Sequence, residues 1–181
     1  LYHLPEEVLR KIYSNPVAYD GPLSSEHTEY IGKPWQVFWQ ENLYMGVDSL
    51  GICKYHTVFL GVTLPTFEEW SKVLYLNTGI EMTPEEIWQV ARRCNMIERL
   101  FNLREGLKRN DLEKGDMLNH RYFDEPCRRG ALDVIGTSID KKKFVKMVDE
   151  LYGHQGLDKN GVPKPETLEE LGLENEPSHL V

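Results

Sequence analysis

The segment Thr83 to Glu86 marks the start of the longest predicted helix and constrains the fold more than any other part of the sequence. Its sequence, TPEE, combines a capping box with a proline at the first helical position. The predicted helix covers about residues 84–105 and ends at Gly106. A single apolar face is expected to run along it, made of Ile87, Val90, Ala91, Cys94, Ile97 and Phe101.

Other helices are predicted from the same kinds of signal. Capping residues, prolines at helix starts and apolar residues at helical spacing indicate each one. The predicted ranges are about 5–14, 34 to 48 or 50, 66–79, a helix capped by Asp140 that reaches Leu151, and a short helix over 166–171. The sequence therefore predicts a mainly α protein, an irregular helical bundle.

The rest of the chain shows weaker signals. Residues 15–34 contain repeated proline and glycine breakers and are predicted to form a long loop. Residues 107–137 have no sustained period and are predicted to be an irregular connection. Only residues 55–62 favour a strand, and that run is short. The chain shows no internal repeat.

Composition and charge exclude several classes of protein. With 40% hydrophobic residues, the 181-residue chain is globular in composition and long enough to bury a core as one domain, residues 1–181. The formal net charge is −8 and the basic residues are scattered, which argues against nucleic-acid binding. No apolar run approaches the length of a membrane span. We expect a soluble protein.

The cysteines point to a reducing compartment. Cys53, Cys94 and Cys127 are odd in number and far apart, so a disulfide framework is not expected and a cytoplasmic location is favoured. The first residue is Leu1 rather than methionine, and a helical pattern follows almost at once. We therefore expect the chain to be a piece of a longer polypeptide.

Cys53, in the stretch DSLGICKYH, has three readings. It could be a buried small hydrophobe, a reactive thiol, or one ligand of a larger site. Gly51 is expected to take a left-handed turn at a helix end, and Lys54 adds positive charge beside the thiol. A single cysteine cannot hold zinc or an iron–sulfur cluster, which need about four ligands. The residues alone favour the buried reading.

The remaining candidates favour structural roles. Cys94 lies on an apolar helix face, and Cys127 has cationic neighbours but no histidine or cysteine close in sequence. His27 and His56 are candidate acids or bases, although solvated roles are favoured for both. The segment 158–161, DKNG, lacks the spacing of a calcium loop and is predicted to be a turn. A solvated helix end is favoured for Arg104.

The order of several motifs is more informative than any one of them. They are DSLGICK at 48–54, TG at 78–79, TPEEIW at 83–88, IERLFNLREG at 97–106, DMLNHRYFDEP at 116–126 and LYGHQGLDKNGVPKPETLEELGL at 151–173. Together they resemble the C-terminal region of the tungsten-containing aldehyde ferredoxin oxidoreductase family, over about residues 34–173. The resemblance implies the C-terminal helical domain of that fold.

The resemblance also implies cofactors and the residues that bind them. In the family, a tungsten or molybdenum bis-pterin lies near a [4Fe-4S] cluster. By resemblance, Asp48 corresponds to a pterin-binding aspartate, Ile52 to a backbone contact with the pterin, and Cys53 to the fourth cluster ligand, which gives a short electron path. The other three cluster cysteines, in a CxxCxxxC segment, are not in this sequence. Both cofactors would therefore be shared with parts of the enzyme outside this chain.

The implied reaction is the oxidation of an aldehyde to a carboxylic acid, with ferredoxin as electron acceptor. The implied partners are the remaining domains of the same enzyme, ferredoxin and a small aldehyde, with a homo-oligomer as an open alternative. The acid or base residues near the metal are not assigned. Two alternatives stay open at this point: the aromatic acyl-CoA reductase branch of the family, and a non-catalytic helical interaction module in which Cys53 is simply buried.

Overall fold

The protein is a bundle of helices of very different lengths. The structure is a computed structural model that describes residues 3–57, 65–111, 115–130 and 132–175. The helices are α1 (Glu6–Tyr13), α2 (Lys33–Ser49), η1 (Lys54–His56, a 3-10 helix), α3 (Phe67–Thr78), α4 (Pro84–Arg104), α5 (Arg121–Asp124), α6 (Lys141–Gln155) and α7 (Pro165–Glu170). The predicted mainly α fold class is confirmed.

The weak strand signal does not produce a strand where the structure describes it. Tyr55 and His56 belong to η1, and residues 58–62 of the predicted run lie outside the described residues. Within the described residues the only β pairing is an isolated bridge between Leu157 and Pro163. The predicted irregular connection contains only the four-residue α5 within its described part.

At α4 and α6, local side chains satisfy the first backbone N–H groups of the helix. At α4, the Glu86 N–H donates to Thr83 Oγ1 at 3.2 Å, and the Thr83 N–H donates to Glu86 Oε2 at 2.7 Å. At α6, Asp140 Oδ1 accepts from the Lys143 N–H at 3.0 Å. These contacts stabilise helix starts by about 1 kcal/mol each. The predicted starts of these helices follow from them.

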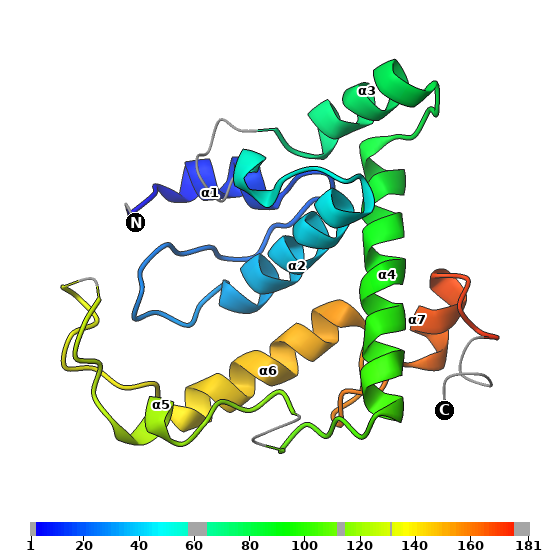
Figure 1. The fold of residues 1–181 in the computed structure, drawn as a ribbon. Helices are drawn as coiled ribbons and strands as arrows, with labels where there is room; N and C mark the ends of the chain where they lie inside the picture. The colour runs from blue at the N-terminus through cyan, green and yellow to red at the C-terminus, as the bar shows by residue number, and fades with distance from the viewer. Residues whose placement is uncertain (1–2, 58–64, 112–114, 131, 176–181) are drawn as a thin grey trace.

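The long helix α4 organises the bundle. Figure 1 shows α2 and α6 on one side of α4 and α7 on the other. α2 contacts α1, α4 and α6, while α3 contacts α4. Gly46 lets α2 pack closely against α3 and α4. A Cβ at this position would lie 3.3 Å from the Phe67 ring of α3 and 3.8 Å from the Ala91 Cβ of α4.

Two hydrophobic cores lie along α4. The first is aromatic, and within it the Phe67 ring makes T-shaped contacts with Trp39, Trp70 and Trp88. The indole N–H groups of Trp35 and Trp39 donate to backbone carbonyls, each at 2.7 Å. The second core contains Met96, Leu100, Val148, Tyr152, Leu157, Leu168, Leu171 and Leu173.

The predicted apolar face of α4 is partly wrong. Ile87 and Ala91 are buried as expected, but Val90, Ile97 and Phe101 are 37%, 41% and 46% exposed. The buried side chains instead include Trp88, Met96 and Leu100, because α2 and α3 cover the first half of the helix and the second core covers the other half. Cys94 is half-buried rather than part of a buried face.

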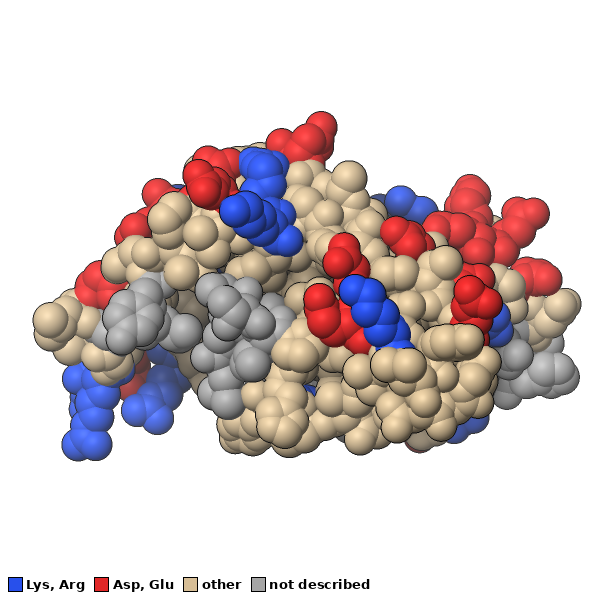
Figure 2. All heavy atoms as spheres, turned by 90° about the horizontal axis from the view of Figure 1, so that it is seen from above, with Lys and Arg blue, Asp and Glu red and all other residues tan. Residues whose placement is uncertain are grey.

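The surface carries charges of both signs. On the face shown in Figure 2, acidic and basic side chains lie in small groups, and in some of these groups the two signs lie side by side. Arg104 pairs with Glu105 at the exposed end of α4, with Nε 3.0 Å from Oε1, as expected of a solvated helix end. Among the described helices, none combines the length and the apolar character needed to cross a bilayer.

Candidate functional site

The chain turns sharply at the end of α2, in the segment 48–54, which we call the motif turn. Gly51 has a φ of +68°, as predicted. The Gly51 N–H donates to the Asp48 carbonyl at 3.2 Å, and the Ile52 N–H donates to the Val47 carbonyl at 3.0 Å. This pair of hydrogen bonds is a Schellman motif, which satisfies carbonyls that a helix end would otherwise leave free.

The motif turn is anchored in the first core. Leu43 and Val47, on the last two turns of α2, have no exposed surface, and Ile52 packs against the same core beyond the turn. An apolar contact across the turn is typical of a Schellman motif. The backbone position of the following residue, Cys53, is therefore fixed by burial on both sides of Gly51.

The Asp48, Cys53 and Lys54 side chains of the motif turn are exposed, whereas Leu50 and Ile52 pack against the first core. Cys53 is exposed and its thiol is free. The buried reading of Cys53 is therefore wrong, because the chain leaves the core after Ile52. Asp48 Oδ2 lies 2.8 Å from Lys54 Nζ, and both side chains are 51% exposed. The hydrogen bond from Lys54 to Asp48 raises the pKa of the Lys54 ammonium.

The other cysteines do not complete a metal site with Cys53. Cys94 Sγ lies 3.9 Å from Ser49 Oγ, so it is close to the motif turn. Cys127 is half-buried and its Sγ lies 3.0 Å from the Arg129 carbonyl oxygen. In the part of the chain that the structure describes, no group of three or more metal-binding side chains includes Cys53. Cys53 can supply only one ligand of a cluster.

The two candidate histidines lie in different places. His56 is exposed in η1, next to the motif turn. His27 precedes α2, and its Nδ1 lies 2.8 Å from Asp133 Oδ2. The 17 residues of α2 separate the two ends by roughly 25 Å. His27 is therefore not a partner of Cys53 within this chain.

His27 also lines a large cavity. The cavity has a volume of about 830 Å³ and lies between the loop before α2, residues within 119–128 and 134–139, and the first half of α6. Most of its surface is apolar, with Tyr122, Val134 and Phe144 in the lining. The sequence does not indicate this cavity, because its walls come from segments about a hundred residues apart.

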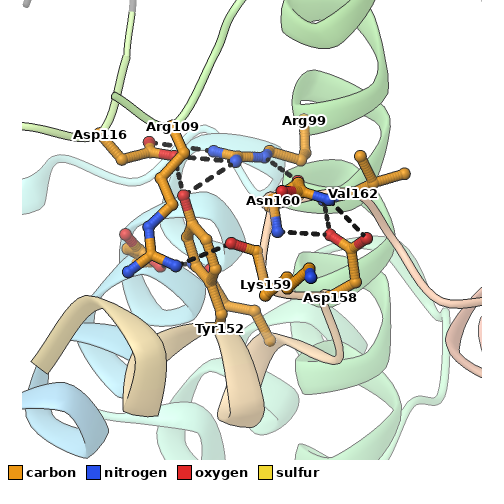
Figure 3. Close-up of polar contacts among 11 residues, drawn as sticks. Arg99, Arg109, Asp116, Tyr152, Asp158, Lys159, Asn160 and Val162 are labelled. Atoms are coloured by element: carbon orange, nitrogen blue, oxygen red, sulfur yellow. Dashed lines mark hydrogen bonds and ion pairs between the residues drawn. The ribbon is translucent and has the colours of Figure 1, made fainter. Parts of the chain in front are cut away.

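A polar network centred on Arg99 was also not predicted. Arg99 forms a two-pronged pair with Asp116, with Nη1 3.0 Å from Oδ1 and Nη2 2.8 Å from Oδ2, and its Nε donates to the Gly161 carbonyl at 2.8 Å. The Tyr152 hydroxyl donates to the same Asp116 carboxylate. Figure 3 shows these groups converging beside the turn that contains Asp158.

The DKNG segment is a turn, as predicted. Asp158 Oδ1 accepts from the N–H groups of Asn160 and Val162 at 2.8 and 2.9 Å. Arg109 Nη1 donates to the Lys159 carbonyl at 2.7 Å. The Asp158 carboxylate is therefore used by the backbone of its own turn (Figure 3). The hydrogen bond from Arg99 to the Gly161 carbonyl joins this turn to the Arg99 network.

Comparisons with known proteins agree on one family. The family model described as aldehyde ferredoxin oxidoreductase, domains 2 and 3, matches residues 6–173. A tungsten-containing aldehyde ferredoxin oxidoreductase of Pyrococcus furiosus is 31% identical over 127 residues, which are 70% of this chain and 19% of the relative. The WOR-like subunit of an aliphatic sulfonate oxidoreductase from the same organism is 29% identical over 82% of this chain and 23% of the relative.

A solved structure shares the fold. The active-site complex of benzoyl coenzyme A reductase, in complex with 1,5-dienoyl-CoA, superimposes with a TM-score of 0.61 and 21% identity. The match covers 97% of this chain and 24% of that one. The chain spans about a fifth of the length of the curated relatives it matches. At this level of identity the structural match shows the fold alone.

Proposed function

Because this chain belongs to the aldehyde ferredoxin oxidoreductase family, we propose that it is the C-terminal helical part of a larger tungsten or molybdenum bis-pterin oxidoreductase. In this proposal the chain contributes one ligand of a [4Fe-4S] cluster and contacts to a pterin. The match to relatives over about a fifth of their length supports a role as part of a larger enzyme.

Cys53 is proposed as the cluster ligand, and Asp48 and Ile52 as the pterin contacts. The observation that carries this is the geometry of the motif turn. A free, exposed thiol follows a rigid Schellman turn and lies in the same short segment as an exposed carboxylate. The thiolate is the form that binds metal. A thiol with a fixed backbone and no partner in the described chain suits a ligand that completes a site on another domain.

The charge of the motif turn is compatible with anionic cofactors. An iron–sulfur cluster with four thiolates and a pterin phosphate both carry negative charge. Lys54 places a cation beside Cys53, and this offsets the negative end of the α2 dipole. Asp48 would exchange its ion pair with Lys54 for a hydrogen bond to the pterin, at little expense because the pair is exposed.

The proposed reaction is the oxidation of an aldehyde to a carboxylate, with water as the source of the added oxygen atom. The reaction releases two electrons and three protons. The bis-pterin metal centre supplies the oxygen-transfer and electron chemistry when bound. The residues of this chain hold the cluster ligand in place and contact the pterin. Electrons would then reach ferredoxin through the cluster.

The test is Cys53→Ala in the full protein that contains this chain. We expect loss of the [4Fe-4S] EPR signal and of aldehyde oxidation with ferredoxin. The helical content measured by far-UV circular dichroism should change little, because the Cys53 side chain lies outside the hydrophobic core of this chain.

Cys94→Ala is the matched control. This second thiol lies near the motif turn but is half-buried against Ser49, so its removal should leave the cluster signal intact. If Cys53→Ala retains both the cluster and the activity, the cluster proposal is wrong and a non-catalytic helical module becomes the better description.

A further inference from the structure

Two histidines and two carboxylates meet beside the 830 Å³ cavity, outside the proposed cofactor site. His3 Nδ1 lies 3.0 Å from Glu26 Oε1, and His27 Nδ1 lies 2.8 Å from Asp133 Oδ2. The two imidazole rings are 5.5 Å apart between centroids and tilted by 50°. These residues come from three segments: the one before α1, the loop before α2 and the loop before α6.

The ligand atoms already lie close to the spacing of a metal site. One ligand atom from each of His3, His27 and Asp133 lies within 4.8 Å of the others. A tetrahedral zinc ion with bonds of about 2.0–2.1 Å places its ligand atoms about 3.3 Å apart. The largest closure required is therefore about 1.5 Å, and the His27–Asp133 pair, at 2.8 Å, must separate by about 0.5 Å. Rotations of the exposed His3 and Asp133 side chains can supply both changes.

We propose that His3, His27 and Asp133 bind a divalent first-row transition-metal ion, for which Zn²⁺ is the test ion. Two imidazoles and one carboxylate are the ligand set that suits such ions, whereas calcium and magnesium prefer oxygen alone. Water would occupy the remaining position. Glu26 is a positioning residue, because a ligand histidine commonly donates its other ring N–H to a carboxylate.

The ion would join three segments that lie far apart in the sequence. His3 precedes α1, His27 belongs to the loop before α2, and Asp133 belongs to the loop before α6. Two of these segments form walls of the cavity, so the ion would fix its shape at the His27 edge. The group of His3, His27 and Asp133 lies near the start of α2, and the motif turn lies at its end. The zinc proposal and the cofactor proposal can therefore fail separately.

The test compares wild type, His27→Ala and His120→Ala in the full protein that contains this chain. After treatment with a chelator, each protein is titrated with Zn²⁺ by calorimetry and its bound zinc is measured. Wild type should bind one more zinc ion per chain than His27→Ala, and zinc should raise its unfolding temperature. His120, an exposed histidine outside the cluster, is the matched control and should be dispensable for this ion.

Two further variants keep the proposal testable. Glu26→Gln should retain the site but weaken it by about 10-fold to 100-fold, as expected when a carboxylate behind a ligand is lost. If His27→Ala does not fold, the exposed Asp133→Asn replaces it and should lose the same ion. Equal zinc binding in wild type, His27→Ala and Asp133→Asn would overturn the proposal. It would show that the histidine and carboxylate side chains form only ion pairs with one another.

Discussion

The Arg99 network and the motif turn use similar residue types in opposite ways. In the network, the Arg99 and Asp116 side chains are 14% and 25% exposed, and their donors and acceptors are satisfied by each other, by Tyr152 and by the backbone. In the motif turn, Asp48 and Lys54 are 51% exposed and pair only across the surface.

The difference distinguishes polar side chains that stabilise the fold from polar side chains that remain available for binding. Partly buried groups that satisfy one another hold α4, α6 and the turn at Asp158 together (Figure 3). Exposed groups on a rigid backbone gain little stability from their contacts and remain available to a partner. Substitutions in the network should therefore affect folding, and substitutions in the motif turn should affect cofactor binding.

The largest expected effect on stability is that of Arg99→Ala. The substitution removes both hydrogen bonds from Arg99 to the partly buried Asp116 carboxylate and the one to the Gly161 carbonyl, so we expect a loss of about 2–3 kcal/mol in the free energy of unfolding. Urea denaturation followed by tryptophan fluorescence measures it. Arg99→Lys keeps the charge but not the two-pronged geometry, so its loss should be smaller. A loss below about 0.5 kcal/mol for Arg99→Ala would remove the contrast with the motif turn.

A smaller effect is expected for Gly51→Ala in the motif turn. An added Cβ meets nothing within 4 Å, so the penalty comes only from the φ of +68° and should be about 1 kcal/mol. Gly153→Ala is the matched control, because that glycine also has open space around it but lies inside α6. The control should be neutral or stabilising. Urea midpoints that shift in the same direction for both variants would contradict the role given to Gly51.

The last effect is a pH dependence in the network, which is absent at neutral pH and appears only above about pH 10. Burial, together with the hydrogen bond to Asp116, raises the pKa of the Tyr152 phenol to about 12. The unfolded phenol loses its proton near pH 10 and the folded one does not, so stability should fall as the pH rises from about 10 to 12. Tyr152→Phe should flatten that part of the urea-midpoint curve relative to wild type. An unchanged slope would mean that Tyr152 is not protected in the fold.

The sequence predicts what depends on neighbouring residues. The bounds of α2 and α4 agree with prediction to within one residue, because Pro34 and the Thr83 capping box act locally. The left-handed Gly51 is predicted for the same reason. The buried face of α4 is predicted only in part. Helical periodicity indicates that one face of a helix is buried, but not how many other helices pack against it or on which sides.

The long-range features could not be predicted from the sequence. His27 and Asp133 are 106 residues apart, and Arg99 and Asp116 face each other across an irregular connection. Cys53 is exposed because the chain leaves the core after Ile52. The local sequence pattern does not indicate where that happens. The roles of Asp48, Ile52 and Cys53 remain predictions from family resemblance, and Cys53→Ala is their test.

The length of α4 has a consequence for how the molecule comes apart. Ile87 and Trp88 belong to the first core, while Met96 and Leu100, two turns further along the same helix, belong to the second. Neither core can lose its packing without disturbing a helix that the other needs. The bundle should therefore melt as one cooperative unit, and slow amide hydrogen exchange should extend along α4 through both of its halves.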